Sequence, residues 1–322
     1  WILTGFRLAL LPFVAGLSYE VLRGLAKLPD NKFTNFLRAP GLAMQRLTTY
    51  PPEDEMAEVA LKSFLAVLAM DADADIGEVK FGEYDPAGVR REIRTALTVY
   101  GLDGREADAE TDWILCNALG MKRNELKNVK KIGHGDYRRA TEILERRICG
   151  EPLDYILGES EFYGNKIKVT RDVLIPRMET EILVDEAVKL IGESSPRVLD
   201  LCTGSGCVAV AVAKATRAHV VASDISEKAL AVAQDNLKGL DAETVLSDMF
   251  RSVEGTFDYI LANPPYIPGK DIAALSEEVR RQPYIALYGG EDGLEFYRAV
   301  AKDYREKLNV GGALIMEIGY DQ

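Results

Sequence analysis

The chain has 322 residues, of which 47% are apolar and 28% charged, so we expect two or more units with buried cores. Its formal net charge of -12 argues against a protein whose affinity comes from neutralising phosphates. The charge is uneven, because residues 151–322 hold 18 Lys and Arg against 29 Asp and Glu (-11), whereas residues 86–150 hold 13 against 10 (+3).

The cysteines and histidines do not indicate a metal site. The four cysteines are Cys116, Cys149, Cys202 and Cys207, and they form no zinc-type spacing with each other or with the two histidines. Cys202 and Cys207 flank a glycine loop and are interpreted as reduced thiols of a cytosolic protein. The chain begins at Trp1 and stops at Gln322 after a strand-like run, so we expect a fragment of a longer chain at both ends.

Residues 1–28 are largely apolar, and roughly 20 such residues are needed to span a membrane. Arg7, Pro12 and Gly16 interrupt the run, and no basic leader or small-residue cleavage site indicates a signal peptide. Two interpretations stay open: the tail of a membrane-embedded segment, or a helix that lies on a bilayer or on other protein. We expect a cytoplasmic protein, held at the inner face of the membrane if this segment belongs to a larger membrane protein.

A helix is predicted from Pro51 to about Met70, because prolines and acids suit the first turn of a helix. Through Gly16–Glu20 and Pro40–Thr49, residues 1–70 resemble the C-terminal end of an uncharacterised family of bacterial multi-pass membrane proteins. The resemblance implies a fusion and supplies no chemistry. Residues 71–86 are acidic, contain glycines and lack apolar periodicity, which is typical of a linker.

Residues 87–150 have apolar side chains at helical spacing, which predicts a small helical bundle. We expect its helices to stop at Gly101, Gly120 and Gly133. The basic pairs of this segment are Lys122-Arg123, Lys130-Lys131, Arg138-Arg139 and Arg146-Arg147. They fit either a solvated surface or a docking face for a macromolecular partner.

Residues 151–196 are expected to connect the bundle to the next domain through a hairpin and a lid. Lys166–Val169 alternates like a strand, and the apolar run Val173–Ile175 predicts another strand that leads into Pro176-Arg177. A lid or hinge over a site would explain that sequence. Glu179-Thr180-Glu181 opens a helix, in which Arg177 and the two acids could equally form a salt-bridged start.

From residue 197 onward the pattern predicts an α/β doubly wound sheet. A buried strand, Arg197–Leu201, runs into the loop Cys202–Gly206 and then into a helix over Val208–Ala215. Glycines let the backbone approach a ligand, and the helix amino end offers free N–H groups. The next strand ends in Asp224, where an acid could bind a ribose diol. A nicotinamide cofactor would fit these features too.

Later strand ends carry further polar groups. A helix over Ser226–Leu237 precedes the strand Glu243–Ser247, after which Asp248 could contact an adenine edge while Met249 and Phe250 cover its face. The strand Phe257–Ala262 leads into Asn263, and a helix near residues 294–308 precedes a fifth strand over 314–318. Ligands bind at the carboxyl edge of such sheets, so we expect these groups to form one site.

The segment Asn263-Pro264-Pro265-Tyr266 suits a planar group that carries an NH2. The Asn263 side-chain oxygen and a proline carbonyl can each accept an N–H bond while the Tyr266 ring packs on the plane of the group. Binding of a nicotinamide cofactor would not explain why these four residues follow the strand. The simpler alternative is a strand-ending turn with a capping Asn.

Residues 87–322 resemble the HemK/PrmC family of methyltransferases. The residues that carry the resemblance are Glu161–Gly164, Leu174–Arg177 with Glu179–Glu181, Asp200–Gly206, Asn263–Tyr266, Ala286–Gly290 and Asp292–Leu294. The resemblance implies a Rossmann-like class I methyltransferase that uses S-adenosylmethionine. It further implies transfer to the side-chain amide of the Gln in the Gly-Gly-Gln loop of class I peptide chain release factors, with the helical bundle helping to hold the release factor and no direct contact with nucleic acid.

The resemblance also implies the site residues. The cofactor would be bound by Asp200, Cys202, Thr203, Gly204, Ser205, Gly206, Asp224, Asp248, Met249 and Asn263. The substrate would be bound by Asn263, Pro264, Pro265, Tyr266, Phe162 and Arg177, with Asn263, Pro264 and Tyr266 catalytic. Three departures from the family stand out: Cys202 replaces a glycine, Gln282 replaces a Glu, and the last two strands of the sheet are lacking.

Two other functions compete with this one. An adenine N6 methyltransferase acting on DNA or RNA would use the same NH2 chemistry, but it needs a flipped base and a cationic track for the nucleic acid. Residues 151–322 have a net charge of -11 and offer no such track. The third possibility is a membrane-associated scaffold whose methyltransferase half is inactive. Calorimetry with S-adenosylmethionine separates the enzymes from the scaffold.

Overall fold

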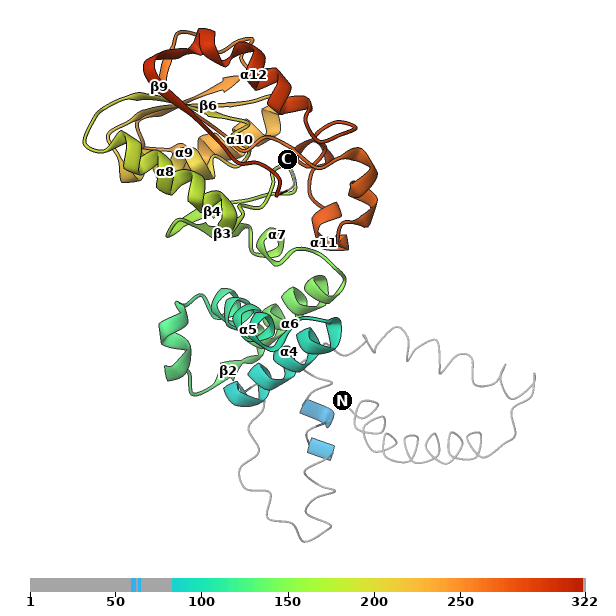
Figure 1. The fold of residues 1–322 in the computed structure, drawn as a ribbon. Helices are drawn as coiled ribbons and strands as arrows, with labels where there is room; N and C mark the ends of the chain where they lie inside the picture. The colour runs from blue at the N-terminus through green and yellow to red at the C-terminus, as the bar shows by residue number, and fades with distance from the viewer. Residues whose placement is uncertain (1–58, 62, 65–82, 321–322) are drawn as a thin grey trace, which may run out of the picture. The chain divides into compact units, whose positions relative to one another are not determined.

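The computed structural model describes residues 59–61, 63–64 and 83–320 (Figure 1). The predictions for residues 1–58, 62 and 65–82 therefore lie outside the described residues, while 59–61 and 63–64 are helical. In the part of the chain that is described, no helix is both long and apolar enough to cross a membrane. The chain divides into two units, residues 1–82 and 83–322, and the second contains both the helical bundle and the sheet.

Three helices form the predicted bundle. They are α4 (Pro86–Tyr100), α5 (Gly104–Leu119) and α6 (His134–Ile148), with the 3-10 helix η1 (Arg123–Asn128) between the last two. The Asp85 carboxylate caps α4 by accepting from the Gly88 N–H at 2.9 Å, and Asp103 caps α5 in a reciprocal arrangement with Glu106. Each of these two helices therefore begins where a side-chain acceptor satisfies its first free N–H groups.

The bundle differs from the sequence prediction at two places. Gly101 and Gly120 end helices as expected, but Gly133 precedes α6. The last part of the predicted linker is structured, because β1 (Glu83–Tyr84) pairs antiparallel with β2 (Ile132–Gly133). A two-residue strand is too short for any periodicity to reveal it.

Most residues of the basic pairs contact acidic side chains, which favours a solvated surface over a docking face made by these charges. Arg123 and Arg90 both contact Asp112, Lys131 contacts Glu83, and Arg138 contacts Glu142. Arg146 contacts Glu151 on the chain that leaves the bundle.

Arg147 differs from its neighbours because it is buried, with a side chain only 1% exposed. Its guanidinium makes two parallel hydrogen bonds to Glu110, at 2.8 and 2.9 Å, and a third at 3.2 Å to Glu278 in α11 (Glu277–Arg280). A buried charge of this kind fixes the side chains around it, because each must stay in place to solvate it. Arg147 thereby ties the bundle to residues that precede the sheet's last strand.

We expect Arg147→Ala to lower the free energy of unfolding by about 2 kcal/mol, because it leaves the Glu110 carboxylate without its partner. Urea denaturation followed by Trp113 fluorescence measures this loss. Arg138→Ala on the same helix is the control, since its exposed pair with Glu142 should contribute less than about 0.5 kcal/mol. Equal stability of the two variants would contradict the assigned role of Arg147.

A short connection follows the bundle. It contains α7 (Leu153–Leu157), the hairpin of β3 (Glu159–Phe162) with β4 (Asn165–Lys168), η2 (Met178–Thr180) and α8 (Glu181–Ile191). The predicted strand over Val173–Ile175 is wrong. The Val173 N–H closes a turn to Thr170, and the Ile175 N–H donates to the Gln282 side chain at 3.1 Å, so neither joins a ladder. The run is apolar because both side chains are buried.

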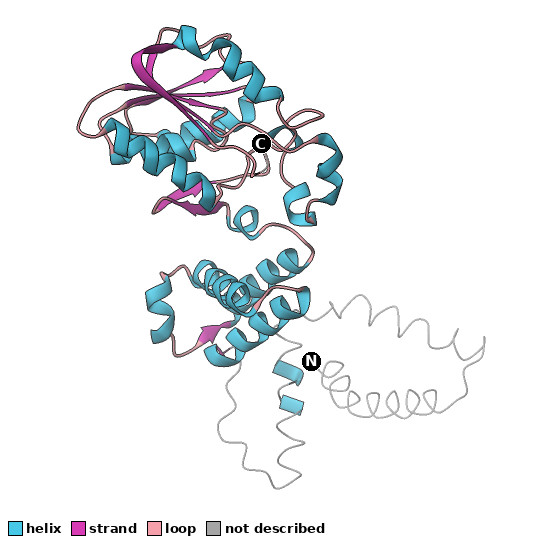
Figure 2. Ribbon diagram, in the orientation of Figure 1, coloured by secondary structure: helices cyan, strands magenta, loops and turns pink. Residues whose placement is uncertain are grey.

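Five parallel strands form the predicted sheet (Figure 2). They are β5 (Arg197–Leu201), β6 (His219–Asp224), β7 (Ala242–Leu246), β8 (Phe257–Ala262) and β9 (Leu308–Met316). Their spatial order is β7-β6-β5-β8-β9, so the chain reverses its direction of travel between β5 and β8. Ligands bind at the carboxyl edge beside such a reversal, where the loops after β5 and β8 separate.

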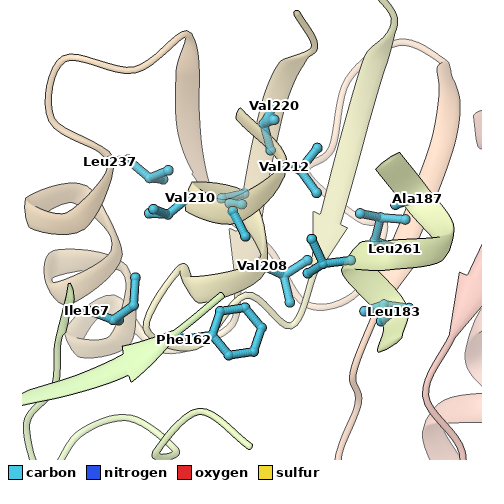
Figure 3. Packing of buried hydrophobic residues seen from close by; sticks show 14 of the residues in the cluster. Phe162, Ile167, Leu183, Ala187, Val208, Val210, Val212, Val220, Leu237 and Leu261 are labelled. Atoms are coloured by element: carbon cyan, nitrogen blue, oxygen red, sulfur yellow. The ribbon is translucent and has the colours of Figure 1, made fainter. Parts of the chain in front are cut away.

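Helices cover both faces of the sheet (Figure 1). α8, α9 (Cys207–Ala215) and α10 (Glu227–Leu237) pack in one apolar cluster, whereas α12 (Glu295–Lys307) packs in another with residues 250–257. Phe162 from the hairpin lies among the valines of α9 in the first cluster (Figure 3). Between β8 and α12 the chain forms η3 (Gly269–Ala274), α11 and η4 (Tyr284–Ala286).

Candidate active site

A cavity opens at the carboxyl edge of the sheet, beside the reversal in strand order. Its lining includes Cys202 and Gly204 after β5, Asp224 at the end of β6, Met249 after β7 and Asn263 after β8. The predicted Asp248 lines it too. The parallel register thus brings together groups that lie up to 61 positions apart in the sequence.

The backbone is strained where it borders this cavity. Three non-glycine residues among those described have a positive φ, and two of them, Cys202 (61°) and Met249 (51°), line the cavity. A side chain in this conformation costs of order 1–3 kcal/mol, and such residues cluster at ligand sites. Cys202 therefore occupies a position where a glycine would fit without strain, which gives a physical reason for the glycine that the family pattern has there.

Asp224 is held so that its carboxylate borders the cavity. Its Oδ2 accepts from the Gly204 N–H at 2.9 Å, and its Oδ1 accepts from the Ser226 N–H at 2.9 Å. Burial raises the pKa of Asp224, while these amide bonds act against that rise. Each carboxylate oxygen has a second lone pair, so the two together can accept two further hydrogen bonds from a diol.

Four of the predicted cofactor residues do not line the cavity. They are Asp200, Thr203, Ser205 and Gly206. The Asp200 Oδ2 accepts from the Thr203 hydroxyl at 2.5 Å and from the Ala209 N–H at 3.2 Å, and burial raises the Asp200 pKa to about 7. Gly206 lies so close to α10 that an added Cβ would be 3.1 Å from the Ala233 Cβ. Asp200 therefore fixes the loop through Thr203 and the start of α9, and Gly206 allows the loop to pack against α10.

A second cavity lies next to the first, around the segment that follows β8. Pro264, Tyr266 and Arg177 line it, as does Glu317, the residue after β9. Leu174, Asn263 and Ala286 line both cavities. Asn263 therefore stands at the junction of the two, which is where a group transferred from one cavity to the other would pass.

Hydrogen bonds connect Asn263 to two residues that sequence reasoning did not assign to the site. The Asn263 Nδ2 donates to the Thr180 hydroxyl at 3.0 Å, and that hydroxyl donates to Glu317 Oε2 at 2.6 Å. Burial raises the Glu317 pKa, an effect that side-chain hydrogen bonds from Thr180, Tyr266 and Asn263 oppose. Glu317 follows the last strand just as Asn263 follows β8, so its place at the carboxyl edge was the signal that could have identified it.

The segment after β8 is held by the glycine-containing run Leu287–Gly290. The Ile267 N–H donates to the Leu287 carbonyl at 3.0 Å, and the Gly289 N–H donates back to the Ile267 carbonyl at 2.9 Å. Gly289 itself lies against the backbone of Pro265 and Tyr266, where an added Cβ would be only 2.6 Å from the Tyr266 Cα. This contact gives a physical reason for the glycine in this motif.

The other residues predicted to bind the substrate do not all lie in the same cavity. Arg177 and Pro264 line the second cavity, and Pro265 lines the first. Phe162 lies elsewhere: its side chain is 1% exposed and packs in the core of the first apolar cluster, so it has no surface to offer a substrate (Figure 3). Gln282 is buried and holds residues 174–177 in place through its bond to the Ile175 N–H, a bond that a Glu oxygen could accept equally.

No cluster of three His, Cys, Asp or Glu side chains among the described residues could hold a metal ion. The two cavities present carboxylates, amides, hydroxyls and aromatic rings. These groups accept and donate hydrogen bonds at one junction, which suits the binding and orientation of two ligands.

Three family models match the chain. Residues 89–158 match the PrmC N-terminal domain, and residues 178–283 match the methyltransferase small domain. Residues 1–70 match a protein of unknown function, DUF1385. That the first segment is the end of a membrane protein stays a prediction.

The chain is also similar to curated proteins named release factor glutamine methyltransferase. It is 40% identical to that of Thermodesulfovibrio yellowstonii over 240 residues, which cover 71% of this chain and 85% of the relative. It is 45% identical to that of Cereibacter sphaeroides over 232 residues, covering 70% and 82%. Among solved structures, a methyltransferase from Pyrococcus furiosus has a TM-score of 0.37 and 21% identity, covering 49% of this chain and 72% of that one.

Proposed function

Because the chain belongs to the release factor glutamine methyltransferase family, we propose that it transfers a methyl group from S-adenosylmethionine to the side-chain amide nitrogen of a glutamine in a peptide chain release factor. The glutamine would be that of the Gly-Gly-Gln loop. The observation that carries the proposal is the position of Asn263, which lines both cavities. A cofactor in the first cavity and an amide in the second would meet there.

The residues of the first cavity fit S-adenosylmethionine. Asp224 offers two oxygens to the ribose hydroxyls, and Met249 with Ile225 offers apolar surface to the adenine. The buried Ser223 hydroxyl lines the same cavity and has no hydrogen-bond partner among the described residues, as expected where a ligand supplies one. S-adenosylmethionine, when bound, supplies an electrophilic methyl group on its sulfonium.

Asn263 and Pro264 would orient the glutamine amide in the second cavity. The Asn263 Oδ1 and the Pro264 carbonyl would each accept one N–H bond, and the Tyr266 ring would pack on the amide plane. An amide nitrogen is a poor nucleophile because its lone pair is delocalised, so orientation must supply much of the acceleration; oriented reactions gain roughly 7 to 11 kcal/mol. Transfer would form the new N–C bond as the methyl–sulfur bond breaks, and the nitrogen would then release one proton to solvent.

The bundle would help to hold the release factor. A further cavity runs from bundle residues Leu102 and Trp113 to Arg177 and Glu179, and the last two also line the cavity around Tyr266. A protein substrate that docks on the bundle could therefore extend a loop along this path to Asn263. We propose residues 87–150 as the docking unit on this basis.

Methylation of a release factor by the full chain tests the proposal. The protein is incubated with labelled S-adenosylmethionine and either a release factor or nucleic acid, and mass spectrometry then locates the label. We expect one methyl group on the glutamine of the Gly-Gly-Gln loop and none on a release factor in which that glutamine is alanine. Label on adenine, or on neither substrate, would contradict the proposed function.

We expect Asp224→Ala to raise the Kd for S-adenosylmethionine about 10- to 100-fold, because it removes hydrogen bonds to a charged acceptor worth roughly 1.5–3 kcal/mol. Isothermal titration calorimetry measures the change. Asp235→Ala is the control, since Asp235 lies on α10 and pairs with surface lysines outside the cavity. An unchanged Kd for Asp224→Ala would place the ribose elsewhere.

A further inference from the structure

We propose that Thr180 and Glu317 are positioning residues, which hold the Asn263 amide so that its oxygen faces the substrate. The inference rests on the proposed function, in which that oxygen accepts an N–H of the substrate amide. It concerns two residues from other elements: Thr180 ends η2, and Glu317 follows β9. The two act through Asn263, and Thr180 lines neither cavity.

The Thr180 hydroxyl carries a single proton, and the direction of that proton determines how Asn263 is oriented. A hydroxyl donates one hydrogen bond and accepts up to two, whereas an ionised carboxylate only accepts. The Thr180 hydroxyl lies 2.6 Å from Glu317 Oε2, so its proton is directed to that oxygen. It can then only accept from Asn263, 3.0 Å away, which requires the Asn263 nitrogen on that side. The Asn263 oxygen consequently points the other way.

The three residues are held in register by the backbone. The Glu317 N–H donates to the Ala262 carbonyl at 3.0 Å, which continues the β8–β9 pairing by one step and places Glu317 beside Asn263. Thr180 is 2% exposed, so water cannot replace either of its partners. Its N–H is bonded to the Arg177 carbonyl, which fixes the turn that carries it.

The orientation of the Asn263 amide decides what the substrate meets. With the oxygen toward the second cavity, Asn263 accepts from the substrate NH2 group. With the amide reversed, the N–H donors of Asn263 would face the N–H donors of the substrate. The clamp formed by the Asn263 oxygen and the Pro264 carbonyl would then lose one of its two acceptors. A terminal amide rotates easily between these states unless its hydrogen bonds distinguish them. The Thr180–Glu317 pair supplies that distinction.

Thr180→Val tests the inference because valine keeps the shape of threonine and removes its hydroxyl. We expect kcat for release factor methylation to fall about 10- to 100-fold, the effect of one hydrogen bond to a charged group, while the Kd for S-adenosylmethionine stays within a few fold. Thr180→Ser retains the hydroxyl and should restore most of kcat. Thr111→Val in α5 is the matched control, since Thr111 is equally buried and its hydroxyl bonds to the Ala107 carbonyl of its own helix.

Glu317→Gln is the second variant, for use should Thr180→Val unfold at lower temperature than the Thr111 control. A glutamine can present either an oxygen or an NH2 group to Thr180, so the Asn263 orientation is no longer fixed and kcat should fall as well. Suppose that kcat falls in Glu317→Gln while a folded Thr180→Val turns over normally. Glu317 would then act directly, and the proposed role of Thr180 in orienting Asn263 would be overturned.

A nitrogen NMR experiment separates this inference from the proposed function. The side-chain amide signal of Asn263, identified by its loss in Asn263→Ala, should shift in Thr180→Val and return in Thr180→Ser, whatever the substrate is. An unmoved signal overturns the inference even if the wild-type protein methylates release factors. A moved signal in a protein that methylates none supports the hydrogen-bond arrangement and contradicts the proposed function alone.

Discussion

Replacing Asn263 by alanine is expected to lower kcat for glutamine methylation about 100- to 1,000-fold, the loss typical of one oriented polar group that stabilises a transition state. The Asn263 oxygen would accept from the amide nitrogen as that nitrogen gains partial positive charge. The interaction therefore strengthens in the transition state, which lowers the barrier and not only the KM. Steady-state kinetics with a release factor measure the loss.

The same variant should leave the Kd for S-adenosylmethionine within a few fold, because Asp224 and the loop after β5 are untouched. Asn309→Ala is the matched control: Asn309 lies at the start of β9, at the opposite edge of the sheet, where its amide donates to Asp258 at 2.8 Å. We expect that control to turn over normally. Wild-type turnover in Asn263→Ala would remove the role assigned to the residue.

The sequence predicted the sheet well because buried parallel strands are continuous apolar runs with clear ends. Arg197–Leu201, His219–Asp224 and Phe257–Ala262 were found within a residue of their observed bounds. The rule that ligands bind at the carboxyl edge then placed Asp224 and Asn263 in one site without any knowledge of the packing. The structure places both on one cavity.

Apolar runs that are buried without a ladder partner could not be distinguished from strands. Val173–Ile175 is such a run, since the Ile175 N–H bonds to the side chain of Gln282, 107 positions later. Phe162 is a second residue whose burial the sequence does not reveal. Its motif, Glu161–Gly164, predicts a substrate contact, and only the packing shows that the side chain belongs to the core.

Thr180 cannot be assigned to the site from its own neighbourhood in the sequence, which predicts only the start of a helix. Glu317 is missed because the sequence predicts a strand that runs to residue 318, whereas β9 ends at Met316 and leaves Glu317 at the carboxyl edge. Their roles depend on contacts across 83 and 137 positions, to Asn263 and to each other. A sequence pattern records local spacing, so hydrogen bonds of this range are visible only after the sheet has been assembled.

Gly289 packs against the segment after β8 so closely that no side chain fits at this position. A Cβ on Gly289 would lie 2.6 Å from the Tyr266 Cα, 2.7 Å from its carbonyl carbon and 2.8 Å from the Pro265 oxygen. All three are backbone atoms, so none can turn aside as a flexible side chain would. Gly289→Ala must therefore move the Pro265–Tyr266 backbone or its own segment.

We expect Gly289→Ala to lower kcat about 100-fold, because a displacement of about 1 Å in an orienting segment is enough for such a loss. The bridge between Ile267 and Gly289 holds the proposed clamp at the junction of the two cavities, and the displacement would shift Pro264 and Tyr266 away from it. Kinetics with a release factor, together with calorimetry of S-adenosylmethionine, should find the loss in kcat and not in cofactor affinity.

Gly135→Ala is the control for this prediction. Gly135 lies in the first turn of α6, where an added Cβ would come no closer than 3.8 Å to the flexible end of Arg139, so alanine should be accepted there without loss of activity. Full turnover in Gly289→Ala would mean that the clamp tolerates displacement. Orientation of the amide by Asn263 and Pro264 could then not be the main source of the acceleration, and the chemistry would have to depend on groups outside this segment.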